Sequence, residues 1–112
     1  MSLTSPIPPK LREEMANDKF YEKCCITGLS KNAVKIDWHH NLQFGGKRVN
    51  EKFCILPLAD FVHGNITKHK EKCDWIMLNR ATDQELEKYS KAIDYKKLRE
   101  TLNAKYGIYI KR

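Results

Sequence analysis

Three histidines and a glycine-rich basic loop stand close together in the segment 35–63, KIDWHHNLQFGGKRVNEKFCILPLADFVH. His39 and His40 are adjacent, and His63 closes the segment. A neutral imidazole has a pKa of about 6.5, so one histidine could accept a proton from water at physiological pH while others hold a divalent ion. Hydrolysis of a phosphodiester needs both functions, because water must be deprotonated and charge on the phosphate must be stabilised. The pattern therefore predicts metal-dependent attack on a phosphodiester.

Two short strands with a long connection are expected to position these groups. Residues 33–38 partly alternate apolar with polar side chains, which predicts a strand that ends at the histidine pair. Residues 41–49 form a loop with a Gly-Gly tip, and the apolar residues 53–56 predict a second strand that Pro57 terminates. A connection of this length inside a small domain tends to be functional.

Helices are expected on both sides of this hairpin. Pro8 and Pro9 favour a helix that stops near Asp18, and residues 58–70 predict a short helix with a bend or break at Gly64. Residues 72–79 add a helical apolar face, and the last two helices, within 82–107, follow caps at Thr82 and Asp94. The fold class is therefore α+β, with residues 1–8 as a flexible arm, 35–70 as the core and 82–107 as a helical scaffold.

Length and charge narrow the class of protein. The chain has 112 residues, which fits one domain, and no apolar run is long enough to span a bilayer or to act as a signal peptide. Lys and Arg outnumber Asp and Glu by 21 to 14, giving a net charge of +7. Phosphate neutralisation by such an excess favours binding to nucleic acid, although solubility alone could explain it. A cytoplasmic location is expected.

The four cysteines do not have the spacing of a zinc site. They stand at Cys24, Cys25, Cys54 and Cys73, with no Cys-x-x-Cys pair. Ordinary, partly buried thiols are the preferred interpretation.

The central segment resembles HNH endonucleases, which have a ββα-metal fold, and particularly the small phage-encoded members. The resemblance extends to IPPKLREEMANDKFYEKCCITG before the segment and to LNRATDQELEKYSKAIDY and LNAKYG after it. It implies a metal-dependent DNA endonuclease with a ββα-metal core between N-terminal and C-terminal helices. It further implies one divalent ion, Mg²⁺ or Mn²⁺ in the first place and Zn²⁺ or Ni²⁺ as alternatives.

The resemblance assigns a role to four residues. His40 matches the histidine that acts as general base. His39 and His63 match metal ligands, the second of them on the helix. Asn50 matches the middle asparagine, which braces the loop and orients the base.

The chain departs from the family pattern at several positions. A spacing of nine residues before His63 falls on Cys54 rather than Asn50, so both remain candidates for the middle position. The Cys-x-x-Cys pair that many members carry before the last histidine is absent. Asn65, His69 or water could complete the metal shell, while Thr67 lies one helical turn after His63.

Other side chains have weaker functional interpretations. Lys47 and Arg48 are expected to contact the DNA backbone, with little sequence specificity, and the alternative is that they are simply solvated. Asp37 could orient an imidazole or be a solvated strand residue, and Trp38 is expected in the core rather than as a stacking platform. The alternative function is a catalytically weak, HNH-fold, nucleic-acid-binding accessory protein, and a weaker one is a structural zinc protein.

Overall fold

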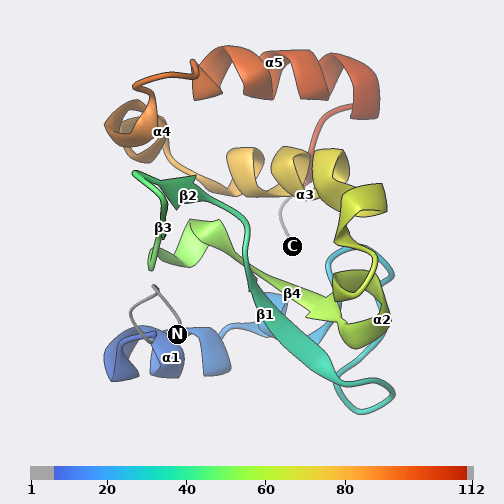
Figure 1. Ribbon diagram of the computed structural model, residues 1–112. Helices are drawn as coiled ribbons and strands as arrows, with labels where there is room; N and C mark the ends of the chain where they lie inside the picture. The colour runs from blue at the N-terminus through green and yellow to red at the C-terminus, as the bar shows by residue number, and fades with distance from the viewer. Residues whose placement is uncertain (1–6, 111–112) are drawn as a thin grey trace.

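Two antiparallel strands lie at the centre of the fold, with helices on both of their faces (Figure 1). In this computed structural model, which describes residues 7–110, β1 (Ile36–His40) pairs with β4 (Ile55–Ala59). The register sets His39 opposite Leu56. The mixture of helices with a small antiparallel sheet confirms the expected α+β class.

The helices surround this strand pair in order along the chain. The remaining elements are α1 (Pro9–Ala16), the 3-10 turns η1 (Lys19–Glu22) and η2 (Lys52–Cys54), α2 (Asp60–His63), α3 (Ile66–Arg80), α4 (Asp83–Tyr89), α5 (Tyr95–Tyr106), and the short strands β2 (Gln43–Phe44) and β3 (Lys47–Arg48). Figure 1 shows α1 on one side of the strands and α3 on the other, with α5 outside α3. None of the helices in residues 7–110 is long and apolar enough to cross a membrane.

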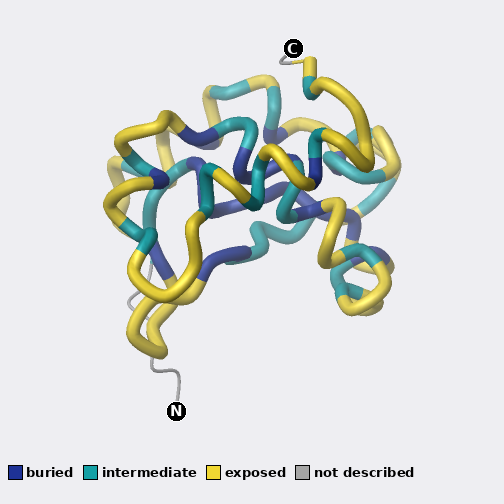
Figure 2. The backbone as a smooth tube through the Cα atoms, turned by 90° about the horizontal axis from the view of Figure 1, so that it is seen from above, coloured by how far each residue is buried: buried dark blue, intermediate teal, exposed yellow. Residues whose placement is uncertain are grey.

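The core has two parts, one on each face of the strand pair. Leu56 and Leu58 of β4 are fully buried in the larger cluster, together with side chains of α3 such as Ile76 and Leu78. Ile55 faces the other way and packs with Met15 of α1 in the smaller cluster. Buried backbone accordingly lies in the middle of the molecule, and exposed backbone lies on the outer helices and loops (Figure 2).

The sequence placed the second strand wrongly by about two residues. Phe53 and Cys54 form the 3-10 turn η2, and Pro57 lies in the middle of β4 instead of ending it. A proline is tolerated there because β4 uses only alternate residues to bond β1. The Pro57 carbonyl accepts from the Cys25 N–H at 2.9 Å, so its backbone edge faces away from β1 and no ladder donor is missing.

The strand carrying the histidines also differs from the expectation. It begins at Ile36 rather than at residue 33 and includes both His39 and His40. The connection 41–49 is not an open loop, because β2 and β3 pair across Gly45 and Gly46. Both glycines have positive φ, 62° and 78°, which is the backbone that a tight two-residue hairpin turn requires.

Several helix boundaries agree with the sequence. The break expected near Gly64 separates α2 from α3. The Thr82 hydroxyl accepts from the Glu85 N–H and the Glu85 carboxylate accepts from the Thr82 N–H, so the capping box is confirmed. Asp94 caps α5, which ends at Gly107 with a φ of 94°.

Two further expectations concern the chain start and the thiols. The expected flexible arm, residues 1–8, lies mostly outside the described residues; Ile7 packs against the smaller core cluster. All four cysteines are free thiols, and three of them are fully buried.

Candidate functional site

The end of β1 presents different side chains on its two faces. Asp37, His39 and Asn41 point toward α2 and α3, as their contacts with His63 and Asp74 show. Trp38, one residue out of phase, instead packs with the smaller core cluster on the α1 side. Adjacent strand residues alternate in this way, so neighbouring histidines are placed in different surroundings.

On the α2 side, His39 and His63 form a pair of imidazoles. Their ring centroids are 5.1 Å apart and their planes are inclined by 60°. Two imidazoles that share one ion at about 2.0–2.1 Å from each nitrogen have centroids roughly 4.5–5.5 Å apart. The spacing of this pair therefore fits shared coordination of a divalent ion.

Asp37 holds the His63 ring in place. Its Oδ2 lies 3.2 Å from His63 Nδ1 and, since a carboxylate only accepts, Nδ1 is the donor. This contact leaves Nε2 of His63 to bind an ion. A carboxylate behind a coordinating imidazole is a common arrangement in metal sites, so the first of the two interpretations of Asp37 is the one that the structure supports.

The environment of His39 favours the neutral imidazole. Burial, followed by the nearby His63, lowers the pKa of His39 to about 4, although a hydrogen bond with Asn41 acts in the opposite direction. A neutral ring has a lone pair to donate to a metal. At pH 7 this histidine is therefore prepared to act as a ligand without first losing a proton.

Of the two candidates for the middle position, Asn50 is the one that contacts His40. His40 Nε2 lies 2.8 Å from Asn50 Oδ1. The hairpin makes this contact possible, because the Val49 N–H donates to the Leu42 carbonyl at 3.2 Å and returns the chain toward β1. Cys54, the other candidate, is fully buried in the larger core cluster.

The structure brings together some of the expected residues and not others. Among residues 7–110, no group of three His, Cys, Asp or Glu side chains has the geometry to hold a metal ion. The Asn65 amide donates to the Phe61 carbonyl at 2.9 Å, within its own helical turn. Among the candidates for a third ligand, His69 does not complete such a group with His39 and His63 in the described part of the chain. The Asn65 contact occupies its Nδ2 and not the oxygen that would bind a metal.

Lys47 and Arg48 lie on β3, beside the Gly-Gly turn. Both side chains are exposed, and within the part of the chain that the structure describes neither forms an ion pair with a carboxylate. The hairpin follows β1 directly, so these two cations are carried by the same loop that brings Asn50 to His40. Their position fits a contact with phosphate near the histidines.

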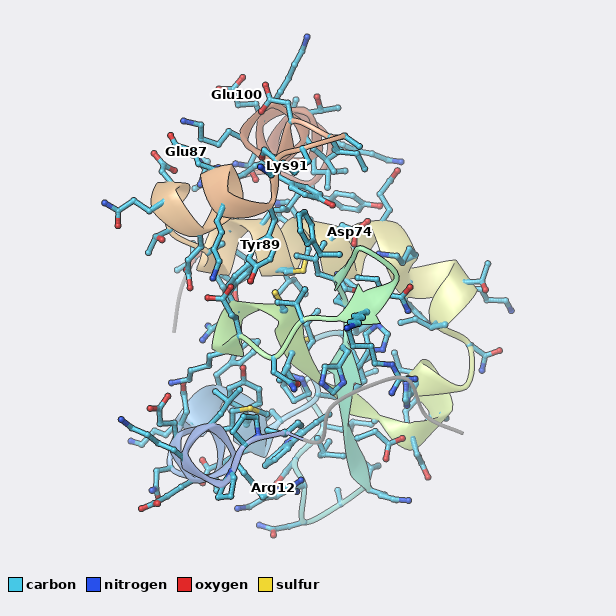
Figure 3. All side chains as sticks on the ribbon, turned by 60° about the vertical axis from the view of Figure 1, so that its left-hand side comes forward. Arg12, Asp74, Glu87, Tyr89, Lys91 and Glu100 are labelled. Carbon is cyan, nitrogen blue, oxygen red and sulfur yellow. The ribbon has the colours of Figure 1, made fainter. Side chains whose placement is uncertain are left out.

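Sequence reasoning missed a group of supporting residues. Asn41 and Asp74 connect His39 to α3, and Tyr89 of α4 contacts both the hairpin and Glu51. Asp74 and Tyr89 are labelled in Figure 3. Asn41 could have been noticed as a polar residue directly after the histidine pair. Nothing in the sequence links Asp74 or Tyr89 to the site, because they are distant from it along the chain.

Comparison with known proteins adds no relative to this description. No family model matches the chain, and no curated protein or solved structure shows a significant match to it.

Proposed function

We propose that this protein is a metal-dependent DNA endonuclease of the HNH type, with β1, β4 and α2 as its ββα-metal core. The observation that carries the proposal is the arrangement at the end of β1. One histidine of the adjacent pair, His40, contacts an asparagine, while the other, His39, lies beside His63. Phosphodiester hydrolysis needs a proton acceptor close to a bound metal ion. Here the proposed acceptor, His40, is adjacent in sequence to His39, one of the two proposed metal ligands.

His40 is the general base in this proposal. With Asn50 Oδ1 as acceptor, His40 Nε2 carries a hydrogen and Nδ1 is left to take a proton from the attacking water. The Asn50 contact fixes the ring orientation, so the lone pair does not have to be positioned during the reaction. After bond cleavage the imidazolium returns its proton to solvent, because the ring is only partly buried.

His39 and His63 are the protein ligands of the ion. A divalent ion there, Mg²⁺ or Mn²⁺ by preference, would act as a Lewis acid that stabilises negative charge on the phosphate and on the leaving oxygen. Asp37 keeps Nε2 of His63 directed away from itself. The 5.1 Å separation of the two rings and the neutral state of His39 support this assignment.

The DNA backbone is the proposed partner. Lys47 and Arg48 would contact phosphates on either side of the scissile bond, and the net charge of +7 adds a general attraction to a polyanion. Such contacts carry little sequence information. We place the activity in the cytoplasm of a bacterium or of a phage-infected cell, on the basis of the resemblance alone.

The deciding experiment is nicking of supercoiled plasmid in Mg²⁺, Mn²⁺, Zn²⁺, Ni²⁺ or EDTA. Wild-type protein should nick with at least one metal and not in EDTA. His40→Ala should lose about 10²–10⁴-fold in rate, because a positioned general base contributes that much. His69→Ala is the matched control, since it removes a histidine from α3 and should keep wild-type activity.

The alternative function is a catalytically weak, HNH-fold, nucleic-acid-binding accessory protein, and the same geometry is compatible with it. No group of three His, Cys, Asp or Glu side chains in residues 7–110 could hold an ion. If this alternative is correct, wild-type protein would not nick with any metal, and its salt-sensitive DNA binding would be the same in EDTA and in His40→Ala. Either function retains the basic hairpin as the DNA contact.

A further inference from the structure

Among residues 7–110, Asn41 is the one polar or charged residue that is buried, with 7% of its surface exposed. Burying an amide is costly unless its hydrogen bonds are made. Here both ends of the amide are used. Nδ2 donates to Asp74 Oδ1 at 2.8 Å and contacts Met77 Sδ at 3.4 Å, while Oδ1 lies 3.2 Å from His39 Nε2.

Asp74 fixes which way this amide points. A carboxylate has no hydrogen to donate, so the Asn41 group that faces it must be the NH₂. Lys70 Nζ donates to the same Asp74 oxygen at 2.5 Å from one turn earlier on α3, so Asp74 is an acceptor toward both neighbours. The Asn41 oxygen is thereby turned toward β1 and toward the ring of His39.

The orientation of Asn41 determines in turn which nitrogen of His39 carries a hydrogen. Facing an amide oxygen, His39 Nε2 must donate, and in the neutral ring Nδ1 then holds the lone pair. His63 has the opposite arrangement, because its Nδ1 donates to Asp37 and its Nε2 holds the lone pair. The two neighbouring imidazoles are therefore in opposite tautomers.

We propose that Asn41 and Asp74 are positioning residues that select the Nε2–H tautomer of His39, so that an ion is held by Nδ1 of His39 and Nε2 of His63. The metal-binding half of this inference rests on the proposed function, whereas the tautomers belong to the free protein and do not. Asp74 lies on α3 (Figure 3). This helix therefore takes part in the site through the contact of Asp74 with Asn41.

The test is the isosteric variant Asp74→Asn. An amide at position 74 can accept from or donate to Asn41, so Asn41 is free to reverse and present its NH₂ to His39, which disfavours the Nε2–H tautomer. Glu71→Gln is the matched control: it lies on α3, loses one negative charge in the same way and pairs with Lys105 and Tyr106 instead of the site.

The first readout is the long-range ¹H–¹⁵N spectrum of histidine side chains in metal-free protein at neutral pH, assigned with single His→Gln variants. We expect Nε2–H for His39 and Nδ1–H for His63 in wild type and in Glu71→Gln, and a mixture or reversal at His39 in Asp74→Asn. Wild-type protein with Nδ1–H at His39, or Asp74→Asn with an unchanged His39, would overturn the inference. The wild-type spectrum decides the tautomers even if Asp74→Asn does not fold.

The second readout is Zn²⁺ binding, measured by calorimetry and in the same spectra. Zn²⁺ should shift Nδ1 of His39 and Nε2 of His63, and Asp74→Asn should weaken binding about 10–100-fold, as loss of groups behind a metal ligand does. Shifts at Nε2 of His39 would overturn the assignment. Failure of the endonuclease proposal would appear separately, as wild-type protein with the expected tautomers that does not nick plasmid.

Discussion

The end of β1, with its hairpin, and the C-terminal helix α5 differ in whether their basic side chains are paired with carboxylates. On α5, three of the four basic side chains pair with carboxylates: Lys96 with Glu87 at 2.7 Å, Arg99 with Asp83 at 2.7 Å, and Lys105 with Glu71. On the hairpin after β1, Lys47 and Arg48 have no such partner among the described residues. Exposed ion pairs within the fold add at most a little to its stability, and their cations are already partly neutralised. Cations without such a partner can bind a polyanion.

The two regions also differ in their polar groups. Between α5 and α3, partly buried polar side chains bond to one another: Asn103 Oδ1 accepts from both Trp75 Nε1 and Asn79 Nδ2. At the end of β1, each of the imidazoles His39, His40 and His63 has one nitrogen held by a side chain of the protein. In the proposed function, the other nitrogen of each ring binds the ion or accepts the proton. This contrast separates a scaffold from a site.

The largest expected effect would separate stability from activity. Leu102 of α5 is buried, and Leu102→Ala should lower the free energy of unfolding by about 2–5 kcal/mol, because it leaves a cavity in the core. Nicking per folded molecule should be unchanged. Urea unfolding and plasmid nicking would measure the two quantities.

Asn50→Ala is the reciprocal variant. It should slow nicking strongly, though by less than the loss of His40 itself, and should change unfolding far less than Leu102→Ala does. Wild-type nicking by Asn50→Ala would show that the contact with His40 is not needed for orientation of the base. A slow Leu102→Ala enzyme, at equal folded concentration, would contradict the separation of scaffold from site.

The charges give the next largest effect. Lys47→Gln with Arg48→Gln should weaken DNA binding and make the salt slope shallower by about 2, since each lost phosphate contact contributes about 0.9. The same pair of changes at Lys96 and Arg99 removes equal charge and should leave the slope close to that of wild type. Fluorescence anisotropy over a range of salt concentrations measures both. Equal slopes for the two double variants would mean that net charge alone, without a defined surface, attracts the DNA.

Tyr89 of α4 links the helical scaffold to the hairpin, and its hydroxyl provides a smaller effect. Its hydroxyl donates to Glu51, the residue after Asn50, and its ring lies 5.2 Å from the ring of Phe44 on the hairpin. Tyr89 is labelled in Figure 3. Tyr89→Phe keeps the ring contacts and loses the hydrogen bond, which should cost about 1 kcal/mol in stability and slow nicking a few fold. An unchanged nicking rate together with reduced stability would show that Tyr89 supports the fold without affecting Asn50.

The sequence predicted the parts of this arrangement that depend on local chemistry. The capping box at Thr82, the break at Gly64 and the histidines at the end of a strand follow from residue preferences at adjacent positions. The errors fell where tertiary contacts decide. A proline at position 57 predicts the end of a strand. The strand continues because the backbone of Pro57 bonds on the edge away from β1, where its carbonyl accepts from the Cys25 N–H.

For the candidate site, the sequence could indicate only the residues proposed to act directly as base, brace or metal ligand. His39, His40, Asn50 and His63 stand within one segment of the chain, where spacing and resemblance bring them to attention. Of the groups that orient these residues, Asp37 and Asn41 lie in the same segment, but Asp74 does not. Asp74 is one acidic residue of a charged helix in the sequence, and only the fold shows that it faces Asn41. Supporting residues of this kind are set by packing between distant segments, which no local pattern records.

The expected effect that is smallest at pH 7 concerns the pH dependence of stability. Burial and the neighbouring His63 lower the pKa of His39 to about 4. The unfolded chain, with a histidine pKa of about 6.5, therefore binds more protons than the folded chain between about pH 4 and pH 6.5. The free energy of unfolding should rise with pH across this window, with the full penalty below about pH 4 and none above about pH 6.5. His39→Asn should flatten this part of the curve in urea unfolding with EDTA present, because it removes the ring that must be charged near His63. An equally steep curve in His39→Asn would show that another group titrates in this range. The end of β1 would then resemble α5, where charged side chains do not depend on burial.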